Sequence, residues 1–448
     1  MRNRLGGREK TMGQFGLMNL SLGLWAALVL FAGQSNAQKF EANYDEAKIP
    51  EFELPAVAPE ERLSKASHPE FASYWKDRRS ELVELFSKEM YGSFPKSPCK
   101  VGCELIESGM SCGGKARRMQ YRVTLSTDAG ELPLNLLVFI PADAKEPVPA
   151  FMGYSFYGNH TVADDAEIEL TEAWSRNSKD KGVVDNRATS SGRGTSKTRW
   201  PVEQIVDSGY GLVTAYYGDI DPDVDDGFNN GIHRLFPEHK PSAEHLDRWG
   251  SISAWAWGMG RFLDACEQID LIDETKVIAI GHSRLGKTSL WAAATDSRFA
   301  AGISNNSGCG GAALSKRAVG ETVGRINDVF PHWFCGNFKK YNLNESELPF
   351  DQHQLIASIA PRPVYVASAS GDRWADPKGE LLAAFTAAKF YERLGYKNTL
   401  QEELPDPGTD FQGQVSYHLR DGKHNITSWD WERYIDFANQ IVFAKSPR

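Results

Sequence analysis

Apolar residues follow two spacings along this chain, one typical of strands and one typical of helices. Short apolar or alternating runs predict strands in six places. These lie at Met119–Leu125, Leu132–Ile140, Ala150–Tyr154, Leu212–Tyr217, Val277–Ile280 and Pro363–Ala367. Apolar positions at helical spacing predict helices at Trp75–Tyr91, Ser251–Gln268 and Glu380–Leu394. Because strands and helices alternate, we expect an α/β fold with a mostly parallel sheet and helices on both faces.

Two segments break this rhythm. Residues 156–200 are rich in Gly, Asn, Asp and Ser, and residues 218–247 carry several Asp, Gly and Pro. Long irregular segments inside a domain usually form rims or lids around a site. We therefore expect both as rim insertions at the C-terminal edge of the sheet. Residues 38–60, rich in Pro and Glu, are expected to form an extended lead-in.

The N-terminus has the pattern of a secretory signal peptide. Basic residues come first, an apolar stretch follows over about residues 15–33, and small residues end it at Ser35-Asn36-Ala37. We predict a signal peptide over 1–37, a single domain over 38–448, and a secreted or periplasmic protein of bacterial type. Two alternatives stay open: a start at Met12, and an uncleaved membrane anchor, since the apolar stretch approaches spanning length.

Charge and cysteine content narrow the possible partners. The net charge of −9 argues against a nucleic-acid partner, which would require a basic face. Six cysteines in an exported protein should partly pair, and among 15 connectivities we favour Cys309–Cys335. No histidine cluster accompanies Cys99 and Cys103, so we expect neither a metal nor another cofactor. We expect a monomer with no membrane contact after signal cleavage.

The most informative stretch is Gly281-His282-Ser283-Arg284-Leu285-Gly286. A strand-like run, residues 276–280, leads into it, and a helix-like run, residues 287–294, follows. A serine on such a strand–turn–helix is typical of a nucleophile elbow, because the turn exposes its hydroxyl beside a helix N-terminus. The second glycine is displaced to Gly286, and a purely structural turn is the alternative.

A serine nucleophile needs a base, and the base needs an orienting acid. In hydrolases with this elbow the chain order is serine, acid, histidine. We favour His424, in a glycine-containing loop before a helix-like stretch, over His418, which lies in a strand-like run. For the acid we favour Asp372, which follows the 363–367 strand, over Asp376, which precedes a proline and could cap a helix.

These residues resemble a known family. The run Gly-x-Ser-Arg-x-Gly-Lys from Gly281 to Lys287, the Asp372-x-Trp374 pair and the late His424 are similar to those of the glucuronoyl esterases of carbohydrate esterase family 15, in its bacterial branch. The likeness covers most of the chain after residue 38. It implies an α/β-hydrolase, a three-layer sandwich, that cleaves esters between 4-O-methyl-glucuronic acid on xylan and lignin alcohols.

The resemblance also implies roles for further residues. Arg284 would help to stabilise the oxyanion, while Lys287, Glu321 and Trp374 would bind the sugar. Each has a plainer alternative: Arg284 could pair with a structural acid, Lys287 and Glu321 could be solvated surface charges, and Trp374 could be core. Trp333 could be core or a sugar platform, and we leave it outside the predicted site.

Two departures from the family bear on function. Many members carry a glutamate where this chain has Asn306, which strengthens the case for Asp372. Fungal members carry a disulfide where this chain has His282 and Asn425. The alternatives to a glucuronoyl esterase are an acetyl or feruloyl esterase on the same fold, and a catalytically impaired carbohydrate-binding relative, which Asn306 suggests.

Overall fold

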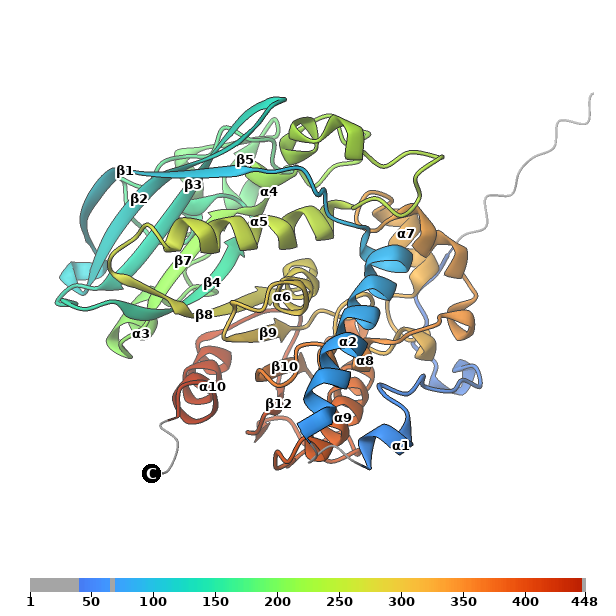
Figure 1. Cartoon of the computed structure of the whole chain (residues 1–448). Helices are drawn as coiled ribbons and strands as arrows, with labels where there is room; N and C mark the ends of the chain where they lie inside the picture. The colour runs from blue at the N-terminus through green and yellow to red at the C-terminus, as the bar shows by residue number, and fades with distance from the viewer. Residues whose placement is uncertain (1–39, 65–68, 445–448) are drawn as a thin grey trace, which may run out of the picture. The chain divides into compact units, whose positions relative to one another are not determined.

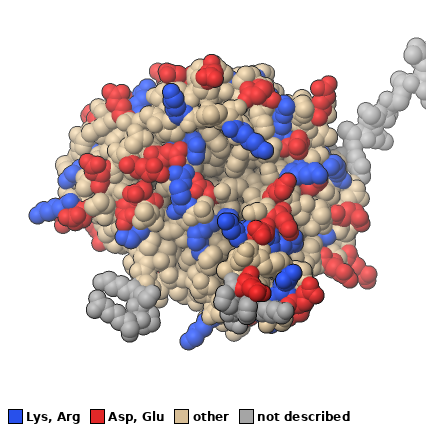
Figure 2. Space-filling view, viewed as in Figure 1, with Lys and Arg blue, Asp and Glu red and all other residues tan. Residues whose placement is uncertain are grey.

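A computed structural model describes residues 40–64 and 69–444. The predicted signal peptide and its cleavage site lie outside these residues. Within them, no helix has both the length and the apolarity needed to cross a membrane. The space-filling view shows acidic and basic side chains interspersed over the visible face, without a basic stripe (Figure 2).

A ten-stranded sheet forms the centre of the fold, in the order β1-β2-β3-β7-β4-β8-β9-β10-β12-β11 (Figure 1). Its strands are β1 (Lys100–Ser111), β2 (Ala116–Thr127), β3 (Gly130–Pro141), β4 (Val148–Ser155), β7 (Gly211–Tyr216), β8 (Ile272–His282), β9 (Ala301–Asn305), β10 (Val364–Ala369), β11 (Thr409–Phe411) and β12 (Val415–Arg420). The run from β7 to β12 is parallel, whereas β1, β2, β3 and β7 pair antiparallel, as do β12 and β11. All six predicted strands are present.

Helices cover both faces of the sheet. They are α1 (Glu60–Leu63), α2 (Pro69–Phe86), α3 (Val202–Asp207), α4 (Tyr217–Ile220), α5 (Ser251–Cys266), α6 (Arg284–Thr295), α7 (Val323–Val329), α8 (Gln352–Ala357), α9 (Pro377–Arg393) and α10 (Ser428–Phe437). Helices α2, α5, α6, α8 and α9 share one apolar core with the sheet, and α3 and α10 share the other. The α/β-hydrolase sandwich of three layers is thus confirmed.

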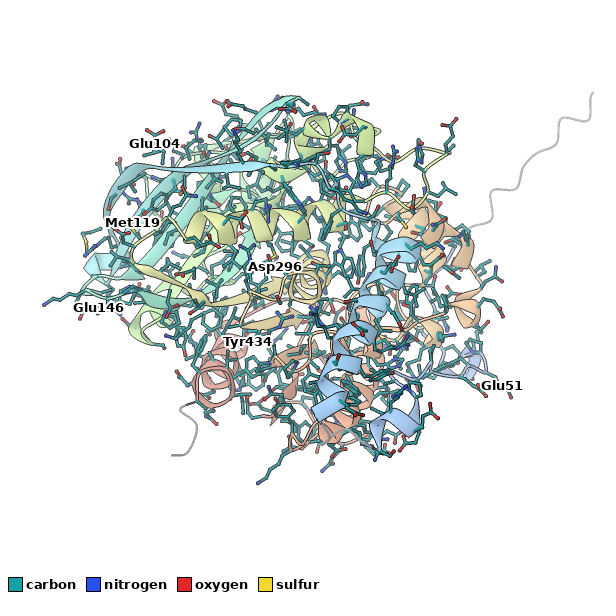
Figure 3. The ribbon with its side chains drawn as sticks, in the orientation of Figure 1. Glu51, Glu104, Met119, Glu146, Asp296 and Tyr434 are labelled. Carbon is teal, nitrogen blue, oxygen red and sulfur yellow. The ribbon has the colours of Figure 1, made fainter. Side chains whose placement is uncertain are left out.

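The alternation of side chains along β8 explains the two cores. Val277 and Ala279 pack into one core, and Ile278 and Ile280 pack into the other, because successive residues of a strand point to opposite faces. A strand buried on both faces needs this continuous apolar run. Tyr434 of α10 lies in the second core, fully buried (Figure 3).

Strand β1 was not predicted, because its sequence lacks the apolar pattern of a buried strand. It is an edge strand with mostly exposed or half-buried side chains, among them Glu104 in Figure 3, so it lacks an apolar period. Helix boundaries also differ slightly. Helix α9 begins at Pro377 rather than Glu380, since proline fits the first helical turn, and α2 ends at Phe86 where a π turn, Ser87–Tyr91, replaces the expected helix.

The predicted Cys309–Cys335 disulfide is wrong. All six cysteines lie in the described part of the chain, and all are free. The Cys335 sulfur faces the Lys88 carbonyl oxygen at 3.6 Å, whereas the Cys309 thiol lies beside Ser315. Burial raises the pKa of both thiols above the ordinary value, to about 12 for Cys335. The prediction rested on these two cysteines flanking the segment that follows the elbow helix. In the structure their sulfur atoms have different neighbours and are not bonded to each other.

Candidate active site

Ser283 lies at the turn between β8 and α6, with φ 58° and ψ −130°. A non-glycine residue with positive φ is strained, as nucleophile elbows are. The turn is so tight that a Cβ on Gly281 would lie 1.8 Å from the Leu285 carbonyl oxygen. A Cβ on Gly286 would lie 3.0 Å from the Ser307 Cβ, which explains a glycine at the displaced position.

His424 and Asp372 form a hydrogen-bonded pair. The distance from His424 Nδ1 to Asp372 Oδ2 is 2.6 Å, and Asp372 is buried while the His424 side chain is 38% exposed. Asp372 comes from the loop after β10, and His424 comes from the loop after β12. These parallel strands are neighbours, so their carboxyl ends bring the two loops together.

The two alternative residues lie elsewhere. Asp376 precedes α9 and its Oδ2 accepts a hydrogen bond from Arg317 Nε at 2.9 Å. His418 lies in β12, fully buried, and both ring nitrogens are engaged, with Asp430 at 2.9 Å and with the Tyr365 hydroxyl at 3.0 Å. Neither lines the pocket described next.

One pocket of about 330 Å³ contains all the predicted site residues. It is lined by Ser283, Arg284, Lys287, Asn306, Ser307, Gly308, Glu321, Phe330, Trp333, Asp372, Trp374, Ala375 and His424. Seven of these, the predicted triad with Arg284, Lys287, Glu321 and Trp374, come from four segments that are far apart in the sequence. Among residues 40–64 and 69–444, no group of His, Cys, Asp and Glu side chains is arranged to hold a metal ion.

Arg284 is paired with an acid and also lines the pocket. Its Nη1 donates to Asp223 Oδ2, and the Tyr217 hydroxyl donates to the same oxygen at 3.0 Å. Asp223 Oδ1 accepts from Trp333 Nε1 at 2.7 Å and lies 3.0 Å from His332 Nε2. Burial alone would raise the pKa of Asp223, but Arg284 and these donors outweigh it and hold that pKa well below its usual range. The guanidinium is therefore kept charged and fixed in direction.

Lys287 and Glu321 are buried rather than surface charges. Their side chains are 3% and 5% exposed, with Nζ and Oε2 3.5 Å apart. Lys287 Nζ also donates to the carbonyl oxygens of Ser307 at 2.6 Å and Cys309 at 2.5 Å. Burial raises the pKa of Glu321, and the neighbouring Lys287 opposes that shift. Trp374 is half-buried at the pocket wall, so it is not ordinary core.

The comparisons with known proteins agree with one another. The family described as "Glucuronyl esterase, fungi" matches residues 243–395. A carbohydrate esterase of an unknown prokaryotic organism is 45% identical over 407 residues, which span 90% of this chain and 93% of that protein. A promiscuous CE15 esterase from a marine bacterial metagenome is 43% identical, with a TM-score of 0.79, over 89% of this chain and 99% of that one. The glucuronoyl esterase from Solibacter usitatus is 41% identical, with a TM-score of 0.79, over 89% and 100%.

The chain belongs to carbohydrate esterase family 15. The resemblance drawn from the elbow, the Asp-x-Trp pair and the late histidine is confirmed, and with it the class of carboxylic ester hydrolase. The catalytic domain of a glucuronoyl esterase from Hypocrea jecorina shares the fold, with a TM-score of 0.55 at 19% identity.

In this family 15 chain, Asn306 contacts Asp372, the residue predicted as the acid. Its Nδ2 donates to Asp372 Oδ2 at 2.8 Å, the oxygen that His424 also contacts. Asn306 directly follows β9 and has a φ of +48°, a conformation that asparagine tolerates better than most residues. The amide thus helps to hold in place the carboxylate oxygen that His424 contacts.

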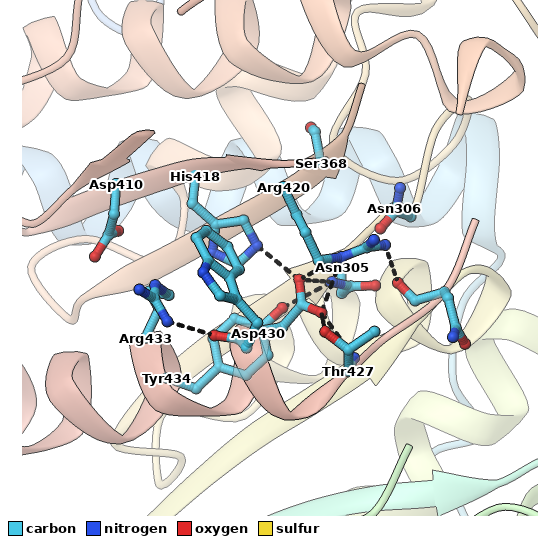
Figure 4. Close-up of polar contacts among 12 residues, drawn as sticks. Asn305, Asn306, Ser368, Asp410, His418, Arg420, Thr427, Asp430, Arg433 and Tyr434 are labelled. Atoms are coloured by element: carbon cyan, nitrogen blue, oxygen red, sulfur yellow. Dashed lines mark hydrogen bonds and ion pairs between the residues drawn. The ribbon is translucent and has the colours of Figure 1, made fainter. Parts of the chain in front are cut away.

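His282, where fungal members of family 15 carry a cysteine, packs against His424 with ring centroids 4.5 Å apart. Its Nδ1 lies 2.6 Å from Asn305 Oδ1, and Asn305 Nδ2 donates to the Tyr434 hydroxyl at 2.8 Å, within the buried network of Figure 4. Burial and the nearby His424 lower the pKa of His282 well below its usual value. A neutral ring therefore packs beside His424.

Sequence reasoning missed Asp223, Phe330 and the pocket position of Trp333. The rings of Phe330 and Trp333 stack at 3.7 Å, and the Arg284 guanidinium lies 5.0 Å from the Trp333 ring centroid. An aromatic run at 330–334 was visible in the sequence, but its distance along the chain from the elbow gave no sign of this contact. Asp223, among several acidic residues of the 218–247 segment, had no distinguishing signal.

Proposed function

We propose that this esterase hydrolyses the ester between 4-O-methyl-glucuronic acid side chains of xylan and lignin alcohols. The observation that carries the proposal is the buried Lys287–Glu321 pair, which shares one pocket with the elbow serine and with Trp374. Sugars present apolar C–H faces and a ring of hydroxyls, so an aromatic wall beside fixed charges suits them. Relatives named 4-O-methyl-glucuronoyl methylesterase support the same substrate class.

In this proposal Ser283, His424 and Asp372 form the catalytic triad. His424 Nε2 takes the proton of the Ser283 hydroxyl as Oγ attacks the ester carbonyl carbon, and it then protonates the departing alcohol. A water molecule, activated by the same nitrogen, releases the uronic acid from the acyl-enzyme. The Asp372 carboxylate holds the histidine by Nδ1 and stabilises the imidazolium that forms.

Arg284 stabilises the oxyanion in this mechanism. The guanidinium stays charged because of Asp223, and a charge-assisted donor strengthens as the carbonyl oxygen gains negative charge. It acts together with backbone N–H groups at the N-terminus of α6. Lys287, Glu321 and Trp374 hold the uronate ring, so that the carbonyl carbon faces Ser283.

A second candidate is an acetyl or feruloyl esterase activity on the same triad. A relative of 43% identity is named a promiscuous esterase, which favours testing it. For location we propose export to the periplasm or the medium, supported by the basic–apolar–small pattern over residues 1–37. We propose a monomer separately, and the export pattern does not bear on it.

One set of assays on a single preparation tests the proposal. We expect benzyl glucuronate to be cleaved with a kcat/KM at least about tenfold above that for 4-nitrophenyl acetate, and acetyl groups of xylan to be released weakly. Cleavage of acetylated xylan or a feruloyl ester in preference to benzyl glucuronate would favour the second candidate. Xylan binding with no ester cleavage at all would favour the catalytically impaired relative.

A further inference from the structure

A short segment near the start of the described chain contacts the part of the pocket that carries Glu321. We call residues 40–46 the N-terminal strap. Asn43 and Gly320 form an antiparallel bridge, in which the Asn43 N–H donates to the Gly320 carbonyl at 3.1 Å and the Gly320 N–H donates back at 2.6 Å. The Asn43 side-chain amide also donates to the Ala318 carbonyl at 2.9 Å.

Gly320 lies next to two residues that line the pocket, Glu321 and Trp374. The next residue, Glu321, donates its backbone N–H to the Trp374 carbonyl at 2.9 Å. Gly320 has a φ of +70°, and a Cβ there would lie 2.3 Å from the same Trp374 oxygen. The 318–321 segment is thus held between the strap on one side and the Trp374 loop on the other.

Further contacts fix the strap at both of its ends. Arg373, which precedes Trp374, donates to the Tyr44 carbonyl, and its guanidinium lies 5.3 Å from the Tyr44 ring centroid. A Cβ on Gly324 would lie 2.4 Å from the Phe40 ring, so α7 packs directly on the start of the strap. The strap therefore contacts the Trp374 loop as well as the Glu321 segment.

We infer that the N-terminal strap is a positioning element for the sugar pocket, and that Asn43 is its central positioning residue. The inference rests on the proposed function. Glu321 and Trp374 are separated along the chain, yet a sugar needs both at a fixed spacing, and loops alone hold such spacing poorly. The strap contacts both the 318–321 segment and the Trp374 loop, and these contacts keep the two segments at a fixed spacing. Cleavage before Gln38, which the sequence predicts, would leave it intact.

The test compares Asn43→Pro with Glu53→Pro in the full chain. The first removes the N–H that bonds Gly320 and the amide that bonds Ala318, and the second changes an exposed residue of the same lead-in. We expect Asn43→Pro to raise KM for benzyl glucuronate about tenfold, with kcat within about twofold. Turnover of 4-nitrophenyl acetate, whose acetyl group is too small to need the sugar contacts, should stay within about twofold, as should both activities of Glu53→Pro.

Several outcomes would overturn the inference. One is a folded Asn43→Pro protein with unchanged KM for benzyl glucuronate, and another is an equal loss on both substrates, which a purely structural role would give. If Asn43→Pro does not fold, Asn43→Ala must still raise KM for the glucuronate ester selectively. That variant keeps the backbone bridge to Gly320 and removes the side-chain bonds to Ala318 and to the Asp45 N–H. If the unmodified protein fails on benzyl glucuronate, the proposed function itself fails, whereas a failure of the strap alone leaves that activity intact.

Discussion

Two histidine–aspartate pairs lie near strands β10 and β12, and only one of them faces the pocket. His418 and Asp430 are both fully buried, with Nε2 and Oδ1 2.9 Å apart. His424 and Asp372 are 2.6 Å apart, and the His424 side chain is 38% exposed. The functional groups are the same in both pairs, so the pairing alone does not identify a catalytic base.

The difference lies in the second ring nitrogen. His418 Nδ1 is 3.0 Å from the Tyr365 hydroxyl, and Asp430 also accepts from Arg420 and Thr427, so every polar atom of that pair is engaged (Figure 4). In the described part of the chain no hydrogen bond engages Nε2 of His424. A base must offer a free nitrogen to its substrate. A pair whose polar atoms are all engaged supports the fold, whereas a pair with one free nitrogen at a pocket can exchange a proton with a substrate.

The largest effect should follow from removing the proposed nucleophile or the proposed base. We expect Ser283→Ala and His424→Ala each to lower kcat for benzyl glucuronate by about 10⁴-fold or more in folded protein, because triad members act as a unit. His418→Gln is the matched control: it should lower the midpoint of thermal unfolding while the folded protein keeps kcat within about tenfold. Near-normal turnover by Ser283→Ala, or an equal loss in His418→Gln, would contradict the distinction between the pairs.

The next largest effect concerns the acid. Asp372→Asn should leave a misaligned imidazole and lower kcat by about 10²–10⁴-fold with little change in KM. Asp376→Asn should change kcat little, since that carboxylate pairs with Arg317, although it should cost stability. Asn306→Glu in the Asp372→Asn background is expected to restore part of the rate from the other side of the histidine. Steady-state kinetics of the three variants decide this, and wild-type kcat in Asp372→Asn would make the assignment wrong.

The two pairs also show which features of the site could be predicted from the sequence and which could not. The elbow, the loop position of His424 and the strand before Asp372 were all readable, because each is a local pattern of apolar run, glycine and polar residue. Local patterns also favoured His424 over His418. The Asp223 contact with Arg284, the Asn306 contact with Asp372 and the strap on Gly320 join segments far apart in the chain. No local period records such contacts, and the incorrect disulfide failed for the same reason.

Arg284 should give an intermediate effect. Arg284→Gln removes the charged donor near the oxyanion, and we expect kcat to fall about 10²–10³-fold, as when one oxyanion donor is lost. The variant should also unfold at a lower temperature, because buried Asp223 then loses its nearer guanidinium and keeps only the more exposed Arg176 at 3.6 Å. Asp223→Asn is the control that keeps the guanidinium but loosens it, so its kcat should fall less. An Arg284→Gln protein with unchanged kcat and lowered stability would assign Arg284 a structural role alone.

One further effect is on stability rather than on rate, and it depends on pH through a carboxyl group close to the pocket pair. Buried Glu380 accepts the backbone N–H of Ser307 at 2.8 Å and of Gly308 at 3.0 Å, next to the asparagine that holds Asp372. Burial raises its pKa to about 8, so the folded state binds a proton that the unfolded state releases above about pH 4.5. The free energy of unfolding should therefore fall as pH rises from about 5 to 8, by at most about 1.4 kcal/mol per pH unit from this group.

Urea titrations at pH 5, 6.5 and 8 measure this dependence. Glu380→Gln cannot ionise and should lose it, whereas Glu392→Gln, exposed on the same helix, should keep it. If the free energy of unfolding has the same slope against pH in Glu380→Gln and in the unmodified protein, Glu380 stays ionised in the folded state. The backbone beside Asn306 would then be held by a fixed negative charge.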